Sequence, residues 1–317
     1  MFSNINTDLE QLNNNLRKIS GPRHPILYAA AEYLFSAGGK RIRPAIILLV
    51  AKATNTKEQL YDEHKRLAEI TEIIHTASLL HDDVVDNCKT RRGLDTVNQK
   101  FNNKVAILAG DFLFAQSSWY LANLNNLSVV KIISKVITDF AEGEIEQGLR
   151  NFDPSSSLDT YMNKSFHKTA SLLAYSCKAA AILSGADSKV QKHFYNYGKH
   201  LGIAFQIIDD ILDLEGTEKN IGKPQGLDLK NGNLTAPTMF ALDKCPELKE
   251  MIQREFTEKN DIQLATQIIT RTNAIKQAKD LAKEHAQASL EYLHSYPKSQ
   301  SIENLKLFSY NIINRIS

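Results

Sequence analysis

Two short acidic stretches contain the residues of this chain whose types and spacing could support catalysis. Each has aspartates at positions i, i+1 and i+4, namely Asp82, Asp83 and Asp86, and then Asp209, Asp210 and Asp213. On a helix this spacing brings the carboxylates close together, where like charges repel. Magnesium relieves such repulsion and usually binds one or two protein carboxylates together with phosphate oxygens. The repeated trio predicts a site for divalent metal ions and for the phosphates that they carry.

A solvated acidic helix end is the alternative explanation for either trio alone. Acidic residues are unfavourable at a helix C-terminus, because the helix dipole is negative there. Both trios also follow apolar pairs, Leu79–Leu80 and Ile207–Ile208, which direct them toward a core. The occurrence of the same arrangement twice favours the metal site.

Basic residues accompany the acidic ones in a way that fits an anionic substrate. Gly38–Gly39 and three cations, Lys40, Arg41 and Arg43, precede Pro44 at the expected start of a helix. Flexible glycines followed by cations at a helix start are able to bind phosphate. Five further cations are candidates for the same role: Arg91, Arg92, Lys168, Lys223 and Lys230. Metal-binding carboxylates combined with cations predict a substrate that carries a diphosphate. The number of cations would suffice for two such substrates.

The composition is that of a globular protein without a dominant charge. Hydrophobic residues make up 43% of the 317 residues, and 38 basic against 36 acidic residues give a net charge of +2. This balance argues against nucleic acid as a partner. Three widely spaced cysteines predict neither disulfides nor a zinc site, and they fit a reducing compartment. Residues 1–20 have neither signal-peptide nor transit-peptide character, and the longest apolar run, residues 45–51, is too short for a membrane span, so a soluble protein is expected.

The spacing of proline, glycine and apolar residues predicts an all-α fold. Long stretches lack proline and carry apolar residues three and four apart, and no alternating run is long enough for a sheet. The expected helices are 28–36, 45–54, 58–86, one starting near residue 98, 109–121, 129–148, 158–185, 188–214, 237–243, 262–292 and 302–313. Residues 215–232 are expected to form an irregular loop. We expect one helical domain over residues 1–317, without an internal linker.

Several motifs, in order along the chain, resemble those of the trans-isoprenyl diphosphate synthases. They are GGKRIRP at residues 38–44, HTASLLHDDVVD at 75–86, GDF at 110–112, KTA at 168–170 and FQIIDDILD at 205–213. The resemblance covers residues 38–237. It implies the isoprenoid synthase fold, a bundle of antiparallel helices around a deep central cavity, usually in a homodimer. It also implies three magnesium ions, with manganese as an alternative, between the six trio aspartates and an allylic diphosphate.

The resemblance further assigns a role to each site residue. Arg91, Lys168 and Lys223 would bind the allylic diphosphate, with Gln206 beside it and Thr169 near the reacting carbons. Isopentenyl diphosphate would be bound by a second set, Lys40, Arg43, His75 and Arg92. The catalytic set would be Asp82, Asp83, Asp86, Lys168, Thr169, Gln206, Asp209 and Asp210. His81 is expected to be structural. Residues 228–233 lack a lysine that shorter-chain members carry near the end of this loop, and Lys230 is the candidate substitute.

The length of the product depends on residues just upstream of the first trio. Ala77 and Ser78 lie five and four residues before Asp82, about 6–8 Å deeper along a helix, and both are small. A bulky residue there acts as a floor in this family, so the small pair predicts a long product. The stop would lie deeper, at Ile74 or Ile70, with Phe114, Ser118 or Trp119 from the following helix.

Residues 109–153 most resemble the cyanobacterial and plastid synthases of the solanesyl tail of plastoquinone. A long-chain polyprenyl diphosphate synthase is therefore expected, in a plastid stroma or a bacterial cytoplasm, with membrane contact at product release. Three alternatives stay open: a geranylgeranyl diphosphate synthase, a class I terpene cyclase and a non-catalytic regulatory subunit. The small residues at 77 and 78 argue against a geranylgeranyl diphosphate synthase. The second aspartate trio and its cations argue against a terpene cyclase, and the six intact aspartates argue against a regulatory subunit.

Overall fold

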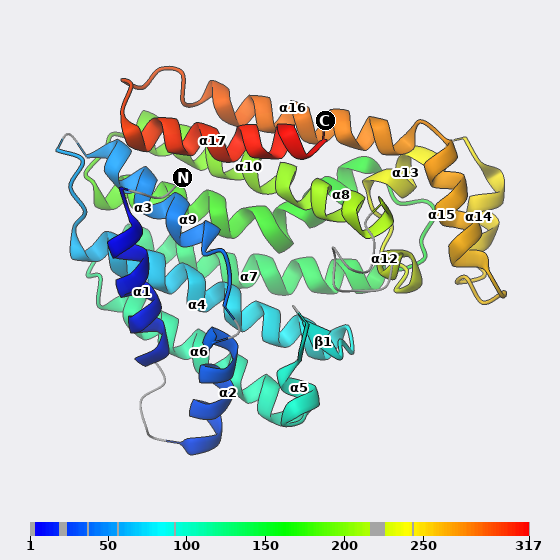
Figure 1. Cartoon of the computed structure of the whole chain (residues 1–317), viewed down its shortest axis with the longest axis horizontal. Helices are drawn as coiled ribbons and strands as arrows, with labels where there is room; N and C mark the ends of the chain where they lie inside the picture. The colour runs from blue at the N-terminus through cyan, green and yellow to red at the C-terminus, as the bar shows by residue number, and fades with distance from the viewer. Residues whose placement is uncertain are drawn as a thin grey trace. The chain divides into compact units, whose positions relative to one another are not determined.

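The computed structural model describes residues 4–18, 24–36, 38–55, 57–91, 93–215, 226–242 and 244–316, and the regular structure in these ranges is helical apart from one short hairpin (Figure 1). The elements are α1 (Asn6–Lys18), α2 (Pro25–Ser36), α3 (Ile42–Thr54), α4 (Asp62–Val85), β1 (Thr90–Arg91), β2 (Leu94–Asp95), α5 (Val97–Lys100), α6 (Asn103–Ala122), α7 (Leu127–Leu149), α8 (Leu158–Ser165), the π-helical turn η1 (Phe166–Ala170), α9 (Ser171–Leu183), α10 (Ser188–Glu215), α12 (Leu227–Lys230), α13 (Ala236–Leu242), α14 (Pro246–Gln253), α15 (Asp261–Arg271), α16 (Ala274–Glu291) and α17 (Gln300–Ile316). The predicted all-α class is confirmed.

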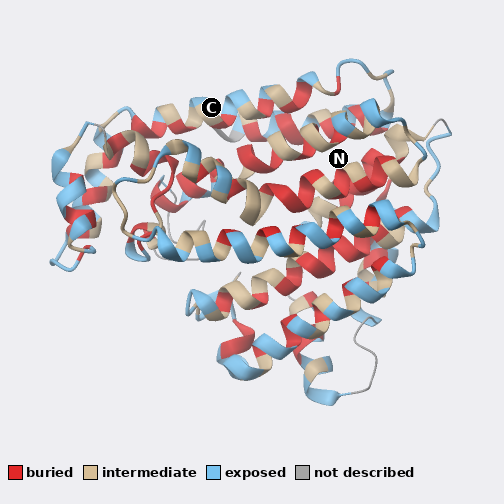
Figure 2. Cartoon of the chain, turned by 180° about the vertical axis from the view of Figure 1, so that it is seen from behind, coloured by how far each residue is buried: buried red, intermediate tan, exposed pale blue. Residues whose placement is uncertain are grey.

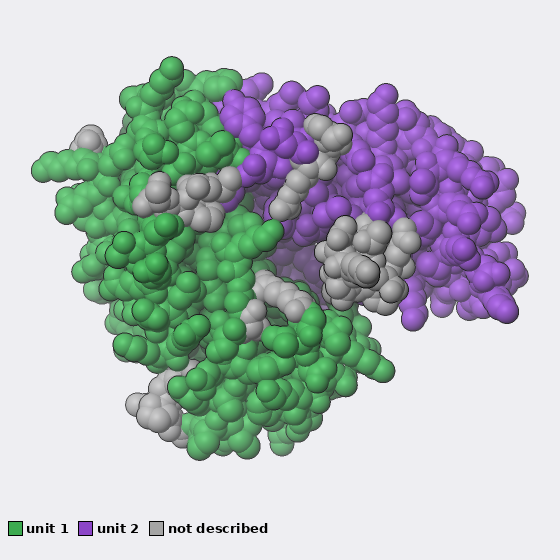
Figure 3. Space-filling model, in the orientation of Figure 1, with its two compact units in different colours: residues 1–137, 172–198, 293–307 green, residues 138–171, 199–292, 308–317 purple. Residues whose placement is uncertain are grey.

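The chain forms two compact units, which are coloured separately in Figure 3. Unit 1 comprises residues 1–137, 172–198 and 293–307 and contains the first acidic trio. Unit 2 comprises residues 138–171, 199–292 and 308–317 and contains the second trio. Each unit therefore carries one half of the residues that the sequence assigns to the site.

The apolar spacing of α4 explains how unit 1 is built around it. Leu67, Ile70, Ile74, Ala77 and Leu80 recur at intervals of three and four and are all buried. They face α3, whose apolar residues 45–51 are buried as well, and α6. Figure 2 shows the resulting alternation of buried and exposed residues around the helices. The packing fixes the direction of α4 and so carries the first trio to its C-terminal end.

Several predicted boundaries were wrong for local reasons. The helix expected from residue 58 begins at Asp62, because Glu58 has a positive φ of 49°. The helix expected from 109 begins at Asn103, where the Asn102 side chain accepts a hydrogen bond from the Val105 amide. The predicted helix 262–292 is broken between α15 and α16, because Thr272 adopts an extended backbone.

Other short helices were not predicted at all. The polar N-terminal segment forms α1, which buries Leu9, Leu12 and Leu16 at helical spacing. α14 was also missed, and α12 lies within the expected loop 215–232. These helices are short or mostly polar, so their apolar pattern is weak in the sequence.

Helix α6 has an exposed apolar face. Among the described residues it is the helix that is long and apolar enough to cross a membrane by length and composition alone, and 33% of its apolar stretch is buried. Ile107, Leu108 and Trp119 are 43%, 47% and 61% exposed. The exposed positions 104, 107, 108, 111, 115, 118, 119 and 122 share one side of the helix. A soluble chain would be expected to cover such a face.

A histidine pair links α10 to α16 inside unit 2. His200 Nδ1 and His285 Nδ1 are 3.0 Å apart, and the His200 ring stacks on Tyr292. Burial, followed by the charges of His285 and Lys199, lowers the pKa of His200 to about 4, against the opposing charges of Glu284 and Glu291. Burial and Lys199 also lower the pKa of His285. The pair is therefore neutral in the folded protein near neutral pH.

This pair is expected to make the protein sensitive to acid. Between pH 6.5 and about 4 the unfolded chain binds protons that folded His200 does not, so stability is lost as the pH falls through this window. The expected loss is about 1–2 kcal/mol, below what the shift alone would give, because the rings are only partly buried. Urea unfolding across this range should show a shallower pH dependence for His200→Phe than for the wild type. The same change in slope for His294→Gln, at an exposed histidine, would contradict this assignment.

Candidate active site

The three cations of the glycine-rich loop before α3 differ in their contacts and in their exposure. Gly38 has a φ of +74°, which only glycine adopts without strain. Arg41 is structural: its guanidinium contacts Glu72 Oε1 at 2.5 Å and Asn13 Oδ1 at 2.8 Å. Lys40 is exposed, and Arg43 is half-buried. Of the three cations in this loop, Lys40 and Arg43 are thus the ones placed to meet a substrate.

Arg43 and His75 come together as the sequence analysis expected. Arg43 Nη1 lies 3.0 Å from His75 Nε2, so α3 and α4 each contribute one side chain. A small cavity of about 40 Å³ is lined by His75 together with Gly38 and Arg91. Unit 1 therefore gathers parts of two motifs and Arg91 in one place. Arg92, assigned to the same substrate, lies outside the described residues.

The first trio does not present its three carboxylates in the same way. Asp83 is 2% exposed and accepts hydrogen bonds from Arg91, with Nε and Nη2 at 2.9 and 2.7 Å from Oδ1. Burial would lower the pKa of Arg91, but the hydrogen bonds and charge of Asp83 outweigh it, so the pKa rises. Asp82 is half-buried and Asp86 is exposed. The three carboxylates thus differ in exposure, and the middle one is held by a cation of the protein.

Removing Arg91 is expected to destabilise the fold as well as the site. In Arg91→Met the Asp83 carboxylate would stay buried without its counterion, and the free energy of unfolding should fall by about 2 kcal/mol. Urea denaturation measures this directly. Arg150→Met is the matched control, because Arg150 pairs with Asp153 while 51% exposed and should cost less than about 0.5 kcal/mol. Equal losses in the two variants would refute the structural importance of the Arg91 pair.

His81 is structural, as expected. Its Nε2 lies 3.0 Å from the Ile107 carbonyl oxygen, and its ring packs against Phe114. The ring also explains Gly110 of the GDF motif, because a Cβ at this position would lie 2.2 Å from His81 Nε2. Gly110 thus allows α6 to approach α4 closely.

The expected wall beneath the first trio is only partly where the sequence analysis put it. Ala77, Ile74 and Ile70 are fully buried, and Ser78 is half-buried with its hydroxyl donating to the His75 carbonyl oxygen at 2.9 Å. Ser118 and Trp119, suggested as deeper stops, are exposed and lie on the outer face of α6. The expectation that Ser118 or Trp119 closes the cavity was therefore wrong, because Trp119 is 61% exposed and Ser118 is exposed as well.

The second trio is held by a chain of hydrogen bonds within unit 2. Thr169 Oγ1 donates to Gln206 Oε1 at 2.6 Å, and Gln206 Nε2 donates to Asp210 Oδ1 at 2.7 Å. Tyr161 donates to Asp210 Oδ2 at 2.6 Å. Burial and the charge of Asp228 raise the pKa of Asp210 to about 8. Three residues predicted as catalytic are thus connected side by side.

Tyr161 was missed by the sequence analysis. It is 1% exposed, and burial, then the charge of Asp210, raises the pKa of its hydroxyl well above the ordinary value. The available signal was a tyrosine two helical turns before Lys168, since a buried tyrosine hydroxyl needs a polar partner. Around it, Asp209 is exposed, whereas Asp210 and Asp213 are 4% and 9% exposed.

Lys168 lies in the π-helical turn η1 and is already paired. Its ammonium forms an ion pair with Glu144 and donates to Gln147 Oε1 at 3.3 Å. The predicted helix 158–185 is thus interrupted where the KTA motif lies, and π-turns are frequent at functional sites. The turn places Lys168 and Thr169 on the side of α7 and α10 within unit 2. Lys223, assigned to the same diphosphate, lies outside the described residues.

The donor set fits magnesium when phosphate oxygens complete it. Within the described ranges, no three His, Cys, Asp or Glu side chains come together as a ready-made metal site. The metal-binding role of the three carboxylates of each trio stays a prediction, and the members differ in burial, since Asp83, Asp210 and Asp213 are buried. Asp86 and Asp209 are exposed, and Asp82 is half-buried. A set of one or two carboxylates per ion is what magnesium uses when it binds with substrate phosphates.

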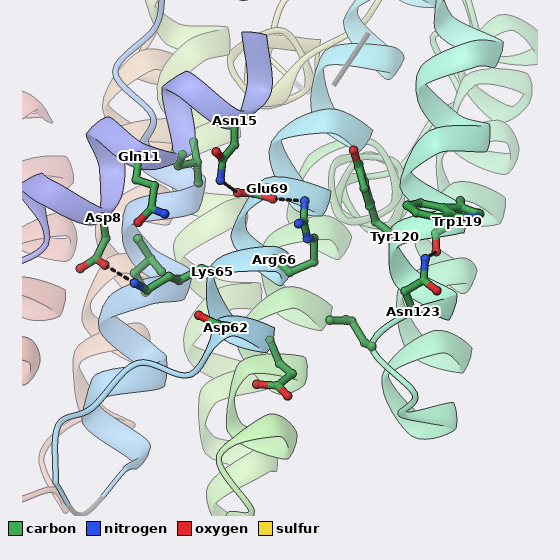
Figure 4. Close-up of a pocket in the computed structure, with 14 residues that line it drawn as sticks. Asp8, Gln11, Asn15, Asp62, Lys65, Arg66, Glu69, Trp119, Tyr120 and Asn123 are labelled. Atoms are coloured by element: carbon green, nitrogen blue, oxygen red, sulfur yellow. Dashed lines mark hydrogen bonds and ion pairs between the residues drawn. The ribbon is translucent and has the colours of Figure 1, made fainter. Parts of the chain in front are cut away.

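A second pocket in unit 1 is excluded as a diphosphate site by its charges. It measures about 530 Å³ and lies among α1, α4 and α6 (Figure 4). Its two cations already have partners, since Lys65 pairs with Asp8 at 3.1 Å and Arg66 pairs with Glu69 at 2.5 Å. Two further acidic residues, Asp62 and Glu63, line it. An excess of carboxylates would repel a diphosphate.

Comparison with known proteins agrees with this geometry. A family model described as polyprenyl synthetase matches residues 24–269, a span that includes both trios and every other motif of the site. The chain belongs to the polyprenyl synthetase family, a family of prenyltransferases. The resemblance seen in the motifs is thereby confirmed.

Relatives of this polyprenyl synthetase match it over nearly its whole length. A prenyl transferase from Porphyra purpurea is 58% identical, over 100% of this chain and 98% of the relative. A chloroplastic solanesyl-diphosphate synthase 2 from Oryza sativa is 49% identical, over 97% of this chain and 77% of the relative. The solved heptaprenyl diphosphate synthase from Staphylococcus aureus has a TM-score of 0.95 and 31% identity, with 100% of both chains covered. A polyprenyl synthase from Caulobacter crescentus, solved with calcium and isoprenyl diphosphate, has a TM-score of 0.92 and 30% identity, over 99% and 96% of the chains.

Proposed function

We propose that the chain, acting as one synthase domain over residues 1–317, extends an allylic diphosphate with successive units of isopentenyl diphosphate to a solanesyl-length product. The observation that carries the proposal is that each unit holds one trio, a half-site, with a cation near it: Arg91 on Asp83 in unit 1, and Lys168 next to Thr169 of the Asp210 network in unit 2. Asp82 and Asp86 in one unit, and Asp209 in the other, would hold magnesium ions, three by the family pattern. Bound there, magnesium would supply positive charge that stabilises the departing diphosphate.

The chain's own residues bind, orient and shield the reactants. Lys168 and Arg91 supply positive charge for the allylic diphosphate as its carbon–oxygen bond breaks and negative charge develops. Lys40, Arg43 and His75 hold isopentenyl diphosphate so that its double bond forms the new carbon–carbon bond. The released diphosphate takes the proton that is then lost. Apolar walls keep water from the allylic cation, which water would quench.

The solanesyl length is supported by the wall residues and by the relatives. Ala77 is buried and small, so the wall of α4 has no bulky side chain at that depth. The rice relative is named for solanesyl diphosphate synthesis and for the chloroplast. A plastid stroma or a bacterial cytoplasm is the corresponding compartment, with the precursor of the plastoquinone side chain as product. So apolar a product would leave by contact with a membrane.

A second copy of the chain is the proposed occupant of the α6 face. Ile107, Leu108 and Trp119 form an apolar row there with few charges, as expected for a dimer interface. Light scattering should give twice the monomer mass for the wild type and the monomer mass for Leu108→Glu. A monomeric wild type would leave a membrane surface as the occupant.

The experiment that tests the function is a product analysis. Purified protein, magnesium, isopentenyl diphosphate and farnesyl or geranylgeranyl diphosphate are incubated, and the dephosphorylated products are sized by mass spectrometry. A ladder that ends at the solanesyl length supports the proposal. An end at geranylgeranyl would keep the chemistry and overturn the length. No elongation by folded protein would favour a regulatory subunit.

A further inference from the structure

A lysine that the sequence analysis did not single out lies within the second half-site. Lys164 is on α8, one turn after Tyr161 and one turn before Lys168. Its ammonium donates a hydrogen bond to Asn233 Oδ1 and faces the charges of Asp210 and Asp228. Burial lowers the pKa of Lys164, and these two carboxylates oppose the shift. Lys164 is half-buried and is placed to supply positive charge to these carboxylates.

Hydrogen bonds connect Asn233 to the second acidic trio through Asp228. Asn233 Nδ2 donates to Asp228 Oδ1 at 3.1 Å, and the Asp228 amide donates to Asp213 Oδ2 at 3.2 Å. Lys164 is thus connected through the loop after α12 to the last aspartate of the trio. Lys230, which the sequence offered as the cation of this loop, is exposed.

The loop is fixed where it meets Lys164. Gly232 has a φ of +75°, and a Cβ there would lie 2.5 Å from the Phe152 ring. The Phe152 amide also donates to the Gly232 carbonyl oxygen at 2.9 Å. Because the backbone beside Asn233 is held in this way, its side chain has a defined position between Lys164 and Asp228.

We propose that Tyr161 and Lys164 form a clamp on α8 that positions the second acidic trio for the metal-bound allylic diphosphate. Tyr161 acts on Asp210 directly, and Lys164 acts on Asp213 through Asn233 and Asp228. Both are positioning residues, since each works through another side chain. The inference rests on the proposed function and adds to it the source of positive charge behind the second trio.

The first measurement is of binding and does not depend on turnover. Manganese binding is followed by electron paramagnetic resonance in the presence of an unreactive thio-diphosphate analogue of farnesyl diphosphate. Lys164→Met and Tyr161→Phe should each weaken this binding by roughly 10–100-fold, the usual effect of removing a residue that orients a metal ligand. In the elongation assay the KM for the allylic diphosphate should rise, while the KM for isopentenyl diphosphate should change less than twofold. Thermal unfolding establishes that each variant is folded, and Tyr161→Phe, which removes one oxygen, remains usable where Lys164→Met is not.

A conservative variant distinguishes positioning by the positive charge from a general structural role. In Lys164→Arg the positive charge beside Asn233 is kept, and binding should stay within about threefold of the wild type. Lys276→Met, at an exposed lysine of α16, should bind as the wild type does. Unchanged binding in Lys164→Met, or a loss in Lys230→Met instead, would overturn the clamp. Wild-type protein that binds manganese and the analogue but does not elongate would refute the proposed function alone.

Discussion

Asp82→Ala and Asp209→Ala are each expected to reduce kcat/KM for elongation by roughly 10³-fold or more, about 4 kcal/mol of transition-state stabilisation. Asp82 is half-buried and Asp209 is exposed, so neither substitution opens a cavity in the core, and thermal unfolding checks that each variant is folded. The loss should appear mainly in kcat, because the missing charge acts where the diphosphate departs. Initial rates with radiolabelled isopentenyl diphosphate measure it.

The control for the first variant lies on the same helix. Asp62→Ala removes an exposed aspartate from the other end of α4 and should leave elongation within about twofold. Asp83→Asn is expected to differ from both, since this carboxylate is buried against Arg91 and its loss should also lower stability. An Asp82→Ala enzyme with more than a tenth of wild-type activity would rule out a metal-binding role for this residue.

Ala77→Phe is expected to shorten the product from the solanesyl length to a short-chain polyprenyl diphosphate. The phenyl ring would project from α4 beneath the first trio, on the path that we propose for the growing hydrocarbon chain. The chemistry of each condensation step should continue, so the initial rate with a short primer should fall far less than the chain length. Mass spectrometry of the dephosphorylated products gives the distribution directly.

A second alanine of α4 provides the matched control. Ala68 is also fully buried, but it lies nine residues earlier and about 180° around the helix, so the two side chains have different neighbours. Ala68→Phe should cost about 1–3 kcal/mol of stability through overpacking and leave the product length unchanged. Ala77→Phe with unchanged products and the same loss of stability would assign Ala77 to the packed core and remove it from the chain-length wall.

The sequence alone determined the class of chemistry and most of the helices. The signals were local: two aspartate trios in apolar surroundings, and glycines with cations at helix starts. Such short patterns can be recognised in the sequence without knowing which segments pack together. Short and mostly polar helices such as α1 and α14 were not predicted because their apolar pattern covers few residues. The break at Thr272 escaped because the backbone of one residue is set by packing that periodicity does not record.

Only the tertiary structure decided how the members of each trio differ. Asp82 and Asp83 are neighbours of the same type, yet the first is half-buried and the second is fully buried against Arg91 from the hairpin that follows. Tyr161 and Lys164 reach the second trio from a separate helix, so no spacing within the motif could indicate them. Burial and hydrogen-bond partners depend on which distant segments pack together, and that is why identical residues in one motif acquire different roles.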